Sequence, residues 1–446
     1  MFWAQHRCVA LRRNHDHITI RDFHALNDTL VLKMLQRISK WYGGALIRLH
    51  EFSPNSHVGI SMEPINNSFN RFPGKVAIVC RYLPEYRYGF YDALARVCSG
   101  GVTIFHGNPL RGGTLKTGNG PQIAKSYLLT TKKWMGGSSC FYTLSGLSRA
   151  IEDFEPDVII AEANPRLLTV RKVVALARKH RLPVYGHGLG TQQQGSSLRY
   201  ARKFIQKRFL ALFDGFICYS SRAEQEYLQL KPRSPTVVAH NACRPRPTAF
   251  PIRSWVFSTR LPSIAFVGAL TARKKVDLLI SACEQIAPRP HINIVGEGPE
   301  LKRLQLLAQK LNVQVSFHGR KQGRELDAIL QQCHLFVLPG TGGLAINEAL
   351  ANGLPLIVGE ADGTQIDTVT ENNGVHLSDA NTITLRDAIV SLLGKPAQLE
   401  KMARESFKLA WEKINVEAMA DEIGRFLVSE NRLRQHLKTP TSGGVH

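Results

Sequence analysis

The stretch LPGTGGLAINEALANGLPLIVGEADG, from Leu338 to Gly363, decides how the second half of this chain folds. The preceding LFVLPG predicts a buried strand that ends near Gly340, and LAINEALAN predicts a short helix that contains one acidic residue, Glu348. Gly353 is typical of the residue that ends such a helix, with Pro355 just beyond it. The order of strand, glycine turn and helix indicates an α/β fold.

The glycines before this helix allow two interpretations. Backbone N–H groups at a helix start favour a diphosphate, and Gly340, Gly342 and Gly343 would let the backbone approach that ligand closely. Glu348, one turn into the helix, would then accept hydrogen bonds from ribose hydroxyls. In the alternative interpretation, the glycines only permit contact between helix and sheet, and Glu348 is a solvated acid. The spacing alone favours neither.

Strand-like and helix-like segments alternate from Lys75 onwards. The predicted strands of the first half are KVAIVCRYL, GVTIFHG, PDVIIAEA, LPVYGHG, GFICYSS and TVVAHNA, with YRYGFYDALARVC and RLLTVRKVVALARKH as helices. After RPRPTAFPIRSWVFSTRLP, which is typical of a linker, the alternation restarts at SIAFVGAL. We therefore expect an α/β protein with two Rossmann-like doubly wound parallel-sheet domains that face each other across a cleft.

The chain is predicted to have four parts: an N-terminal extension in 1–72, two Rossmann-like domains in 73–250 and 251–412, and a C-terminal helix with a basic tail in 413–446. The last helical pattern is long enough to return to the first domain. In the extension, VLKMLQRISKWYGGALIRL predicts a basic amphipathic helix, and EFSPNSHVGISMEPINNSFNRFPGK indicates a linker.

Composition narrows the classes of partner and compartment. The net charge is +22, and residues 73–250 hold 26 Lys and Arg against 10 Asp and Glu. Such an excess favours an anionic membrane face, an anionic lipid-linked substrate or nucleic acid, unless it only solvates the surface. No recognised nucleic-acid module occurs in the basic half, so we expect no nucleic-acid partner. The eight scattered cysteines and the lack of a signal peptide or membrane-spanning run predict a cytoplasmic protein.

A second basic glycine turn opens the second domain. In FVGALTARKKVDLLI, a predicted strand ends near Gly268, and Arg273 and Lys274 follow where a diphosphate would need its charge neutralised. Cations at a helix start oppose the helix dipole, and an anion would relieve that conflict. The segment VGEGPE repeats the turn with Gly296 and Gly298, which is a weak signal by itself.

Polar residues also follow the predicted strands of the first domain. His187 lies between two glycines at the end of LPVYGHG, Glu162 ends PDVIIAEA, and Arg87 follows the first strand. Strand ends of this kind are where open α/β sheets bind ligands. Each residue also has a plain structural alternative, namely packing for His187, capping for Glu162 and a surface position for Arg87. No Asp-x-Asp run follows a strand, so no metal is expected.

The second half resembles the nucleotide-sugar-binding domain of the retaining glycosyltransferases of family four, which have the GT-B fold. The similar segments, in the family's order, are VGALTARKKVDLLI, VGEGPELKRL, VSFHGR, CHLFVLPG, GGLAINEALANGLPLI and ADGTQ. The first half is more loosely similar, through PEYRYGFYDALA, PDVIIAEANPRLL, YGHGLGTQ and VVAHNA, to the acceptor domain of enzymes that build bacterial surface polysaccharides.

The resemblance implies roles for the matching residues. Lys274 would contact the donor diphosphate, Glu348 the ribose, and His187 the reacting sugar. The remaining donor-side residues of the prediction are Gly268, Arg273, Gly296, Gly298, Gly340, Gly342, Gly343 and Leu344. The predicted acceptor side consists of Arg87, Glu162, His187 and Gly188.

Two positions depart from the family's pattern. Where the family usually has a glutamate eight positions before Glu348, this chain has Gly340. Where the family usually has an arginine after the first glycine of the opening turn, this chain has Ala269. The first change puts recognition of the sugar hydroxyls, or activity itself, in question, while Arg273 could replace the second contact. We interpret Gly340 as the trait of a subfamily.

The resemblance implies a hexosyltransferase that takes a UDP- or GDP-sugar, without a cofactor, and a lipid-linked saccharide acceptor on the inner face of the plasma membrane, in capsule or lipopolysaccharide synthesis. The departing phosphate would take the acceptor's proton on the same face of the sugar, while His187 orients that sugar. Two alternatives stay open: a catalytically silent nucleotide-sugar-binding protein, and a nucleotide-sugar epimerase of similar architecture.

Overall fold

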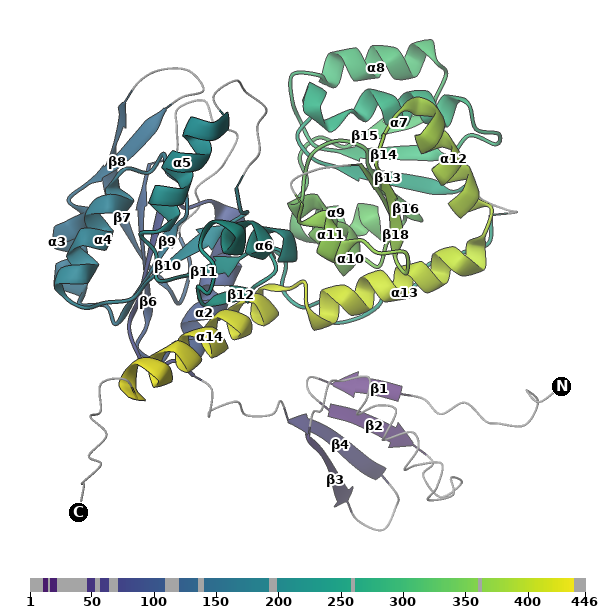
Figure 1. The fold of residues 1–446 in the computed structure, drawn as a ribbon. Coiled ribbons are helices and arrows are strands. Elements are labelled where there is room, and N and C mark those ends of the chain that lie inside the picture. The colour runs from purple at the N-terminus through teal and green to yellow at the C-terminus, as the bar shows by residue number, and fades with distance from the viewer. Residues whose placement is uncertain are drawn as a thin grey trace. The chain divides into compact units, whose positions relative to one another are not determined.

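The structure is a computed structural model that describes residues 11–14, 17–21, 46–52, 57–63, 71–108, 120–134, 140–191, 199–257, 261–359 and 363–436. The chain divides into two compact units, Met1–Arg71 and Phe72–His446. Each unit is described by itself. The second unit holds both parallel sheets, which form a first lobe and a second lobe (Figure 1).

The N-terminal unit contains a four-stranded antiparallel sheet in the order β1-β2-β4-β3. Its strands are β1 (Leu11–Asn14), β2 (His17–Arg21), β3 (Leu46–Phe52) and β4 (His57–Glu63). The interpretation of EFSPNSHVGISMEPINNSFNRFPGK as a linker is wrong for β4 and for the last two residues of β3. In HVGISME, the apolar residues alternate, which is a strand pattern hidden among turn residues. Most of the predicted amphipathic helix lies outside the described residues, and its last four residues belong to β3.

The first lobe is built on an eight-stranded sheet in the order β12-β11-β10-β9-β5-β6-β7-β8, in which only β8 runs antiparallel to its neighbour. The strands are β5 (Val76–Tyr82), β6 (Val102–Gly107), β7 (Lys125–Trp134), β8 (Phe141–Ser145), β9 (Val158–Glu162), β10 (Val184–Gly188), β11 (Gly215–Cys218) and β12 (Thr236–Val238).

Strand β5 shows why this sheet is buried on both faces. Its side chains are buried without alternation from Val76 to Cys80. Ala77 and Val79 belong to the apolar core on one face, while Val76 and Ile78 belong to the core on the other. A continuous run of apolar, mostly β-branched residues therefore serves two cores at once, as a central parallel strand requires.

The second lobe is a six-stranded sheet in the order β15-β14-β13-β16-β17-β18, with every pair parallel. Its strands are β13 (Ser263–Val267), β14 (His291–Val295), β15 (Val315–Phe317), β16 (Leu335–Leu338), β17 (Leu356–Gly359) and β18 (Gly374–Leu377). A single apolar cluster surrounds this sheet. The two parallel-sheet lobes confirm the predicted α/β fold class.

Helices cover the faces of both sheets. In the first lobe, these are η3 (Glu85–Arg87), α2 (Tyr88–Val97), α3 (Leu147–Phe154), α4 (Thr169–Lys179), α5 (Arg199–Leu210) and α6 (Ser221–Leu230). In the second lobe, these are η5 (Ala272–Lys274), α7 (Val276–Glu284), α8 (Leu301–Lys310), α9 (Gly323–Leu330), α10 (Leu344–Ala351), α11 (Gln365–Thr368), α12 (Thr382–Leu393) and α13 (Pro396–Glu412). In the described part of the chain, no helix is long and apolar enough to span a bilayer.

The last helix, α14 (Val416–His436), packs on the first lobe, although it follows the second lobe in the chain (Figure 1). Met419 and Ile423 of α14 lie in the same core as Leu94 of α2. The single long helical pattern of the sequence is in fact two helices. Asn415 separates them, because its amide donates to the Ala410 carbonyl of α13 while its Oδ1 accepts from a backbone N–H of α14.

Candidate functional site

The strand orders define one switch point in each lobe, where the chain changes the direction in which it adds strands. In the second lobe this point lies between β13 and β16, and in the first lobe it lies between β5 and β9. Open α/β sheets bind ligands beyond the carboxyl ends of the strands at such points. The segments after β13 and β16 hold Lys274 and Gly340, while Arg87 follows β5 and Glu162 ends β9. These four predicted residues thus lie at the two switch points.

At the second-lobe switch point, the turn after β16 rests directly on the turn after β13. The Thr341 N–H donates to the Arg273 carbonyl at 3.1 Å. A Cβ atom on Gly340 would lie 2.3 Å from that carbonyl oxygen and 2.7 Å from the Cα of Lys274. Only a residue without a side chain fits there unless one of the backbones moves.

This contact gives a physical reason for the departure at Gly340. A glutamate at this position needs a Cβ where the Arg273 carbonyl oxygen lies. The missing carboxylate is therefore part of how the two turns pack in this chain. The role of Gly340 in donor binding stays a prediction.

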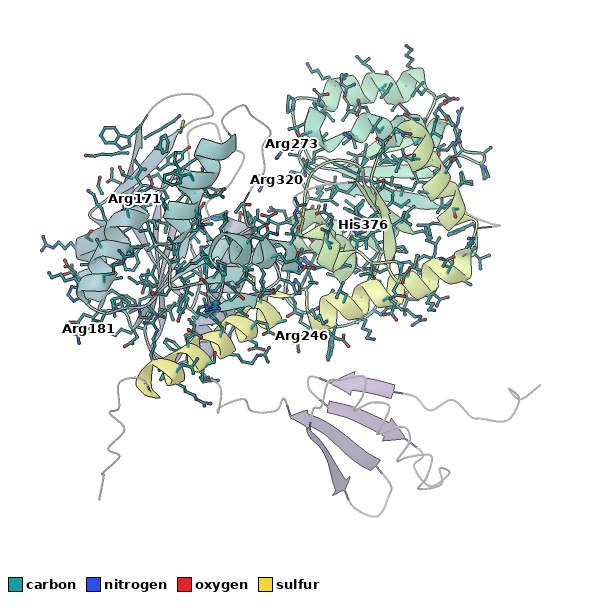
Figure 2. The ribbon with its side chains drawn as sticks, in the orientation of Figure 1. Arg171, Arg181, Arg246, Arg273, Arg320 and His376 are labelled. Carbon is teal, nitrogen blue, oxygen red and sulfur yellow. The ribbon has the colours of Figure 1, made fainter. Side chains whose placement is uncertain are left out.

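Lys274 ends η5, and its side chain is buried against the glycine turn before α10. A Cβ on Gly342 would lie 2.3 Å from the Lys274 Nζ, and a Cβ on Gly268 would lie 3.6 Å from its Cε. Lys274 is only 8% exposed, whereas Arg273 beside it is exposed. A buried ammonium group at a helix start favours an anion as partner, because desolvation makes a charge costly. Figure 2 shows Arg273 and Arg320, which follow β13 and β15, at the same end of the second-lobe sheet.

The other predicted donor-side glycines also bring backbones together. A Cβ on Gly296 would lie 1.9 Å from the Gly268 carbonyl oxygen, and one on Gly298 would lie 2.2 Å from that of Leu270. Gly343 is the residue that precedes α10, and Leu344 is the first residue of that helix. Gly296 and Gly298 thus each permit a close approach of two backbone segments, and their contact with a donor stays a prediction.

Glu348 lies in the second turn of α10 and is not a solvated acid. Its Oε2 lies 3.4 Å from the Nε of Arg244, whose guanidinium also donates to both oxygens of Asp327 at 2.8 Å. The pKa of Glu348 is raised to about 7, mainly by burial. The positive charge of Arg244 opposes this rise, and the negative charge of Asp327 adds to it. The Oε2 atom has no hydrogen-bond partner among the described residues. Glu348 can therefore accept a hydrogen bond from a ligand hydroxyl.

In the first lobe, Glu162 and His187 are register partners on the neighbouring strands β9 and β10. The Glu162 carboxylate accepts from the backbone N–H of Arg81 at 3.0 Å and from the amide of Asn164 at 2.9 Å. Glu162 therefore closes the turn that follows its own strand and also fixes the end of β5. This arrangement fits the capping interpretation, and contact of Glu162 with an acceptor stays a prediction.

His187 is held by a tyrosine that the sequence reasoning did not single out. The Nδ1 of His187 lies 2.7 Å from the Oη of Tyr219, which directly follows β11. Burial holds the pKa of His187 well below its usual value. The carboxylate of Glu162 opposes this shift, and the guanidinium of Arg87 adds to it. The buried Nε2 has no hydrogen-bond partner among the described residues. The imidazole is therefore neutral near pH 7 and has one nitrogen that no other described residue occupies.

Arg87 is buried, so the interpretation of this residue as a surface arginine is wrong. Its Nη2 donates to the Oδ1 of Asn241 at 2.6 Å, and its guanidinium lies 5.1 Å from the ring centre of Tyr219. Its Nη1 is buried without a partner among the described residues. A buried guanidinium held by an amide and aromatic rings favours an anion nearby.

One short segment joins the two groups of residues. Asn241 binds Arg87 of the first lobe, the Cys243 N–H donates to the Asn347 side chain of α10 at 3.2 Å, and Arg244 pairs with Glu348. The sequence interpretation places Arg244 at the start of a linker. Its contacts could not be found from the sequence, because Pro and Arg residues around it resemble a solvated connection.

The glycines beside His187 have packing partners as well. A Cβ on Gly188 would lie 2.8 Å from the hydroxyl oxygen of Tyr227, and that hydroxyl accepts from the N–H of Gly190 at 3.2 Å. Gly190 has a φ of 86°, a conformation that favours glycine. Gly188 therefore lets the loop after β10 approach α6 closely.

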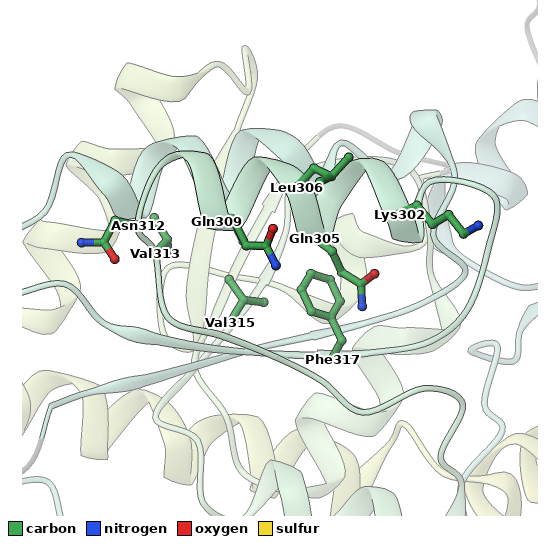
Figure 3. A pocket seen from close by; sticks show the side chains of 9 residues that line it. Lys302, Gln305, Leu306, Gln309, Asn312, Val313, Val315 and Phe317 are labelled. Carbon is green, nitrogen blue, oxygen red and sulfur yellow. The ribbon is translucent and has the colours of Figure 1, made fainter.

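A surface groove of about 660 Å³ lies away from these residues, between α8 and the edge strand β15 (Figure 3). Leu306, Val313 and Phe317 line it together with Gln305 and Gln309. None of the predicted site residues lines this groove. Among the described residues, no three His, Cys, Asp or Glu side chains gather as a metal-binding group.

Comparisons with known proteins support the resemblance. Residues 252–409 match the family model described as "Glycosyl transferases group 1". A curated relative, the uncharacterized glycosyltransferase MJ1178 of Methanocaldococcus jannaschii, is 27% identical over 157 residues, which are 33% of this chain and 44% of that protein. The alignment thus spans less than half of that relative's length.

Solved structures share the whole two-lobed fold. The structure of Anabaena Alr3699/HepE in complex with UDP has a TM-score of 0.60 at 15% identity and covers 80% of this chain and 99% of that chain. The lipopolysaccharide outer core galactosyltransferase WaaB in its apo form has a TM-score of 0.59 at 12% identity and covers 80% and 99%. The fold predicted from the resemblance is confirmed.

Proposed function

We infer that this chain, whose second lobe matches the glycosyl transferases group 1 family, is a retaining hexosyltransferase. It moves a sugar from a nucleoside-diphosphate sugar to a lipid-linked saccharide in the synthesis of a surface polysaccharide. HepE, which has the same fold, is described in complex with UDP, and WaaB is described as a lipopolysaccharide galactosyltransferase. These descriptions support UDP as the nucleotide of the donor and a polysaccharide as the product.

The contact between Lys274 and the glycine turn before α10 carries this proposal. The ammonium group lies beside Gly342, and both the turn and the lysine belong to the switch point of the second-lobe sheet. When the bond between sugar and diphosphate breaks, negative charge grows on the diphosphate oxygens. A fixed ammonium and the backbone N–H groups of Gly342 and Gly343 stabilise that charge without having to reorganise. Arg273, exposed at the same turn, adds a second cation.

Glu348 binds the ribose in this proposal. Its carboxylate lies one to two turns beyond the diphosphate site on α10, and its Oε2 has no hydrogen-bond partner among the described residues. Arg244 keeps the carboxylate in place from one side. The ribose hydroxyls donate to the remaining lone pairs, which discriminates against sugars that lack those hydroxyls.

The first lobe binds the acceptor. Its strong positive charge favours an anionic lipid carrier and the anionic inner face of a plasma membrane. Arg87 follows β5 at the switch point of this lobe, and His187 lies on β10, next to β9. In this proposal the acceptor and the donor sugar meet beside these two residues. The departing phosphate takes the proton of the attacking hydroxyl, so that transfer needs no protein nucleophile and the anomeric configuration is retained.

A transfer assay tests this function. Purified protein is incubated with bacterial lipid extract and a panel of radiolabelled UDP- and GDP-sugars, and the label in the lipid fraction is counted. We expect one donor to label the lipid and the product to retain the anomeric configuration of that donor. A Lys274→Met variant should label at least tenfold less, because it keeps the apolar stem and removes only the charge.

The same assay separates the alternatives. An altered nucleotide sugar without labelled lipid would show an epimerase. Tight binding of a nucleotide sugar without any turnover, measured by calorimetry, would show a silent binding protein. Either result overturns the transfer function.

A further inference from the structure

We propose that Tyr219 is a positioning residue that donates its hydroxyl proton to Nδ1 of His187, so that His187 presents Nε2–H as a fixed, neutral hydrogen-bond donor to the sugar. The proposal rests on the function inferred above for its consequence in catalysis. The hydrogen bond itself can be tested without any activity.

The geometry brings one donor and one acceptor together and nothing else. The Oη of Tyr219 lies 2.7 Å from Nδ1 of His187, and the two rings meet edge to face with centres 5.7 Å apart. Among the described residues, the Tyr219 hydroxyl has no second hydrogen-bond partner, and Nε2 of His187 has none. The proton between the two rings can therefore be assigned from chemistry alone.

The acidities of the two groups decide where this proton lies. A phenol is the stronger acid and a neutral imidazole nitrogen the stronger base, so the bond O–H···N is favoured over N–H···O. The guanidinium of Arg87, 5.1 Å from the centre of the Tyr219 ring, strengthens this preference, because a cation over the ring makes the hydroxyl a better donor. Nδ1 is then the acceptor, and the remaining ring proton must lie on Nε2.

Burial and the charge of Arg87 keep His187 neutral against the effect of Glu162, and a backbone hydrogen bond keeps Tyr219 in place. Glu162 faces it from β9, but both carboxylate oxygens already accept from Arg81 and Asn164. Arg87 faces the pair from η3 and opposes a positive charge on the imidazole. The backbone N–H of Tyr219 donates to the Gly188 carbonyl at 3.1 Å, which ties the end of β11 to the residue after His187.

This arrangement assigns a limited role to His187 in the transfer. A neutral imidazole that donates from Nε2 can bind a hydroxyl or ring oxygen of the sugar, but it is a poor base for the attacking hydroxyl. The proton of the acceptor must then leave by another route, as the proposed transfer to the departing phosphate provides. Activity should therefore show no ionisation of His187 between pH 5 and 8.

Nitrogen NMR of protein labelled with ¹⁵N-histidine tests the hydrogen bond, and the spectrum of His187→Gln identifies the signals of His187. We expect the wild-type protein to show a protonated Nε2 and a hydrogen-bonded, unprotonated Nδ1. In Tyr219→Phe, the ¹⁵N chemical shift of Nδ1 should change to that of a nitrogen without a hydrogen bond. Tyr142→Phe is the matched control, since Tyr142 is a buried tyrosine with Arg81 5.0 Å from its ring centre, and it should leave the His187 signals unchanged. A protonated Nδ1 in the wild-type protein overturns the proposal.

Kinetics test the positioning role. Tyr219→Phe should lower kcat about tenfold while the KM for the donor changes less than about twofold, and Tyr142→Phe should change neither. Glutamine places an amide N–H where Nε2–H lies and asparagine does not, so His187→Gln should retain more activity than His187→Asn. Equal kcat for Tyr219→Phe and wild type, or a better His187→Asn, overturns the role. A wild-type protein without transfer refutes the function inferred above, whereas the NMR result stands on its own.

Discussion

The two lobes share one fold, but backbone contacts dominate at the strand ends of one lobe and side-chain contacts at those of the other. In the second lobe, glycines at the strand ends let one backbone turn rest on another, as Gly340 rests on the Arg273 carbonyl. In the first lobe, large side chains fill the same position, with Tyr219 between Arg87 and His187. Under the proposed function, a site made from backbone N–H groups suits the diphosphate that nucleotide-sugar donors share, while a site made from side chains can be adapted to one acceptor.

This difference predicts how each lobe responds to substitution. The backbone site should tolerate no added Cβ atom but should be insensitive to pH, apart from Glu348. The side-chain site should tolerate changes in size better, but its function should depend on which ring nitrogen of His187 carries the proton.

The largest effect is expected for Lys274, the buried cation of the backbone site. Replacing it as Lys274→Met should lower kcat/KM about 100- to 1000-fold, equivalent to about 3–4 kcal/mol in the barrier, because the growing charge on the diphosphate loses its ammonium partner. Steady-state kinetics with the accepted donor measure this loss. Lys302→Met, an exposed lysine of the same lobe, is the control and should be unchanged. Unaltered kinetics for Lys274→Met would remove this residue from the site.

A smaller effect is expected when a single methyl group is added at the contact between the two turns. Gly340→Ala should lower the free energy of unfolding by about 1–3 kcal/mol and weaken donor binding, since its Cβ would lie 2.3 Å from the Arg273 carbonyl oxygen. Thermal denaturation and donor titration measure the two effects. Gly89→Ala is the control: a Cβ there meets nothing within 4 Å, and this helical position should gain up to about 1 kcal/mol. Equal stability of both variants would contradict the close contact.

The smallest of the three effects concerns the pH dependence of stability at Glu348. Its pKa is raised from 4.5 to about 7, so the folded state prefers the protonated carboxyl. The contribution of this carboxyl to the free energy of unfolding is therefore fully present below pH 4.5 and is lost as the pH rises through about 7. Glutamine does not titrate, so the free energy of unfolding of Glu348→Gln should rise relative to that of the wild type by roughly 1–2 kcal/mol between pH 4.5 and 7.5. This energy is reduced to allow for the partial exposure of the site.

Urea denaturation at a series of pH values measures this gain. Glu325→Gln is the control, because this glutamate of the same lobe is exposed and pairs only with Lys321 on the surface. Its profile should follow that of the wild type. A pH-independent difference between Glu348→Gln and the wild type would show that Glu348 titrates like a solvated acid.

The strand and helix alternation of the second lobe could be predicted because its signals are local. The strand LFVL and the helix LAINEALA lie where the pattern places them, and Gly353 has the φ of 56° expected of a residue that ends a helix. Strand β7 was not predicted, since nearly all of its side chains are exposed and it carries no apolar pattern. The break at Asn415 also escaped prediction, because that residue acts through contacts with both flanking helices.

The candidate site could be predicted only as far as strand ends reveal it. Lys274 follows β13, Glu348 lies in the helix after β16, and His187 lies near the end of β10, so their surroundings could be located from the sequence. Tyr219 and Arg244, which contact His187 and Glu348, could not be located in this way, because only folding brings these residues together. Each of these partners lies in a segment whose composition is that of an ordinary strand end or linker.

Because α14 returns to the first lobe, that lobe depends on a helix that follows the second lobe in the chain. Its apolar residues complete a core whose other members come from 72–242; those of α14 are Val416, Met419, Ala420, Ile423, Phe426 and Leu427. A polypeptide released from the ribosome only as far as the second lobe would still expose the apolar face that these residues cover. Completion of the first lobe therefore waits for the synthesis of α14, and a stop codon near Glu412 would damage the lobe most distant from it along the chain.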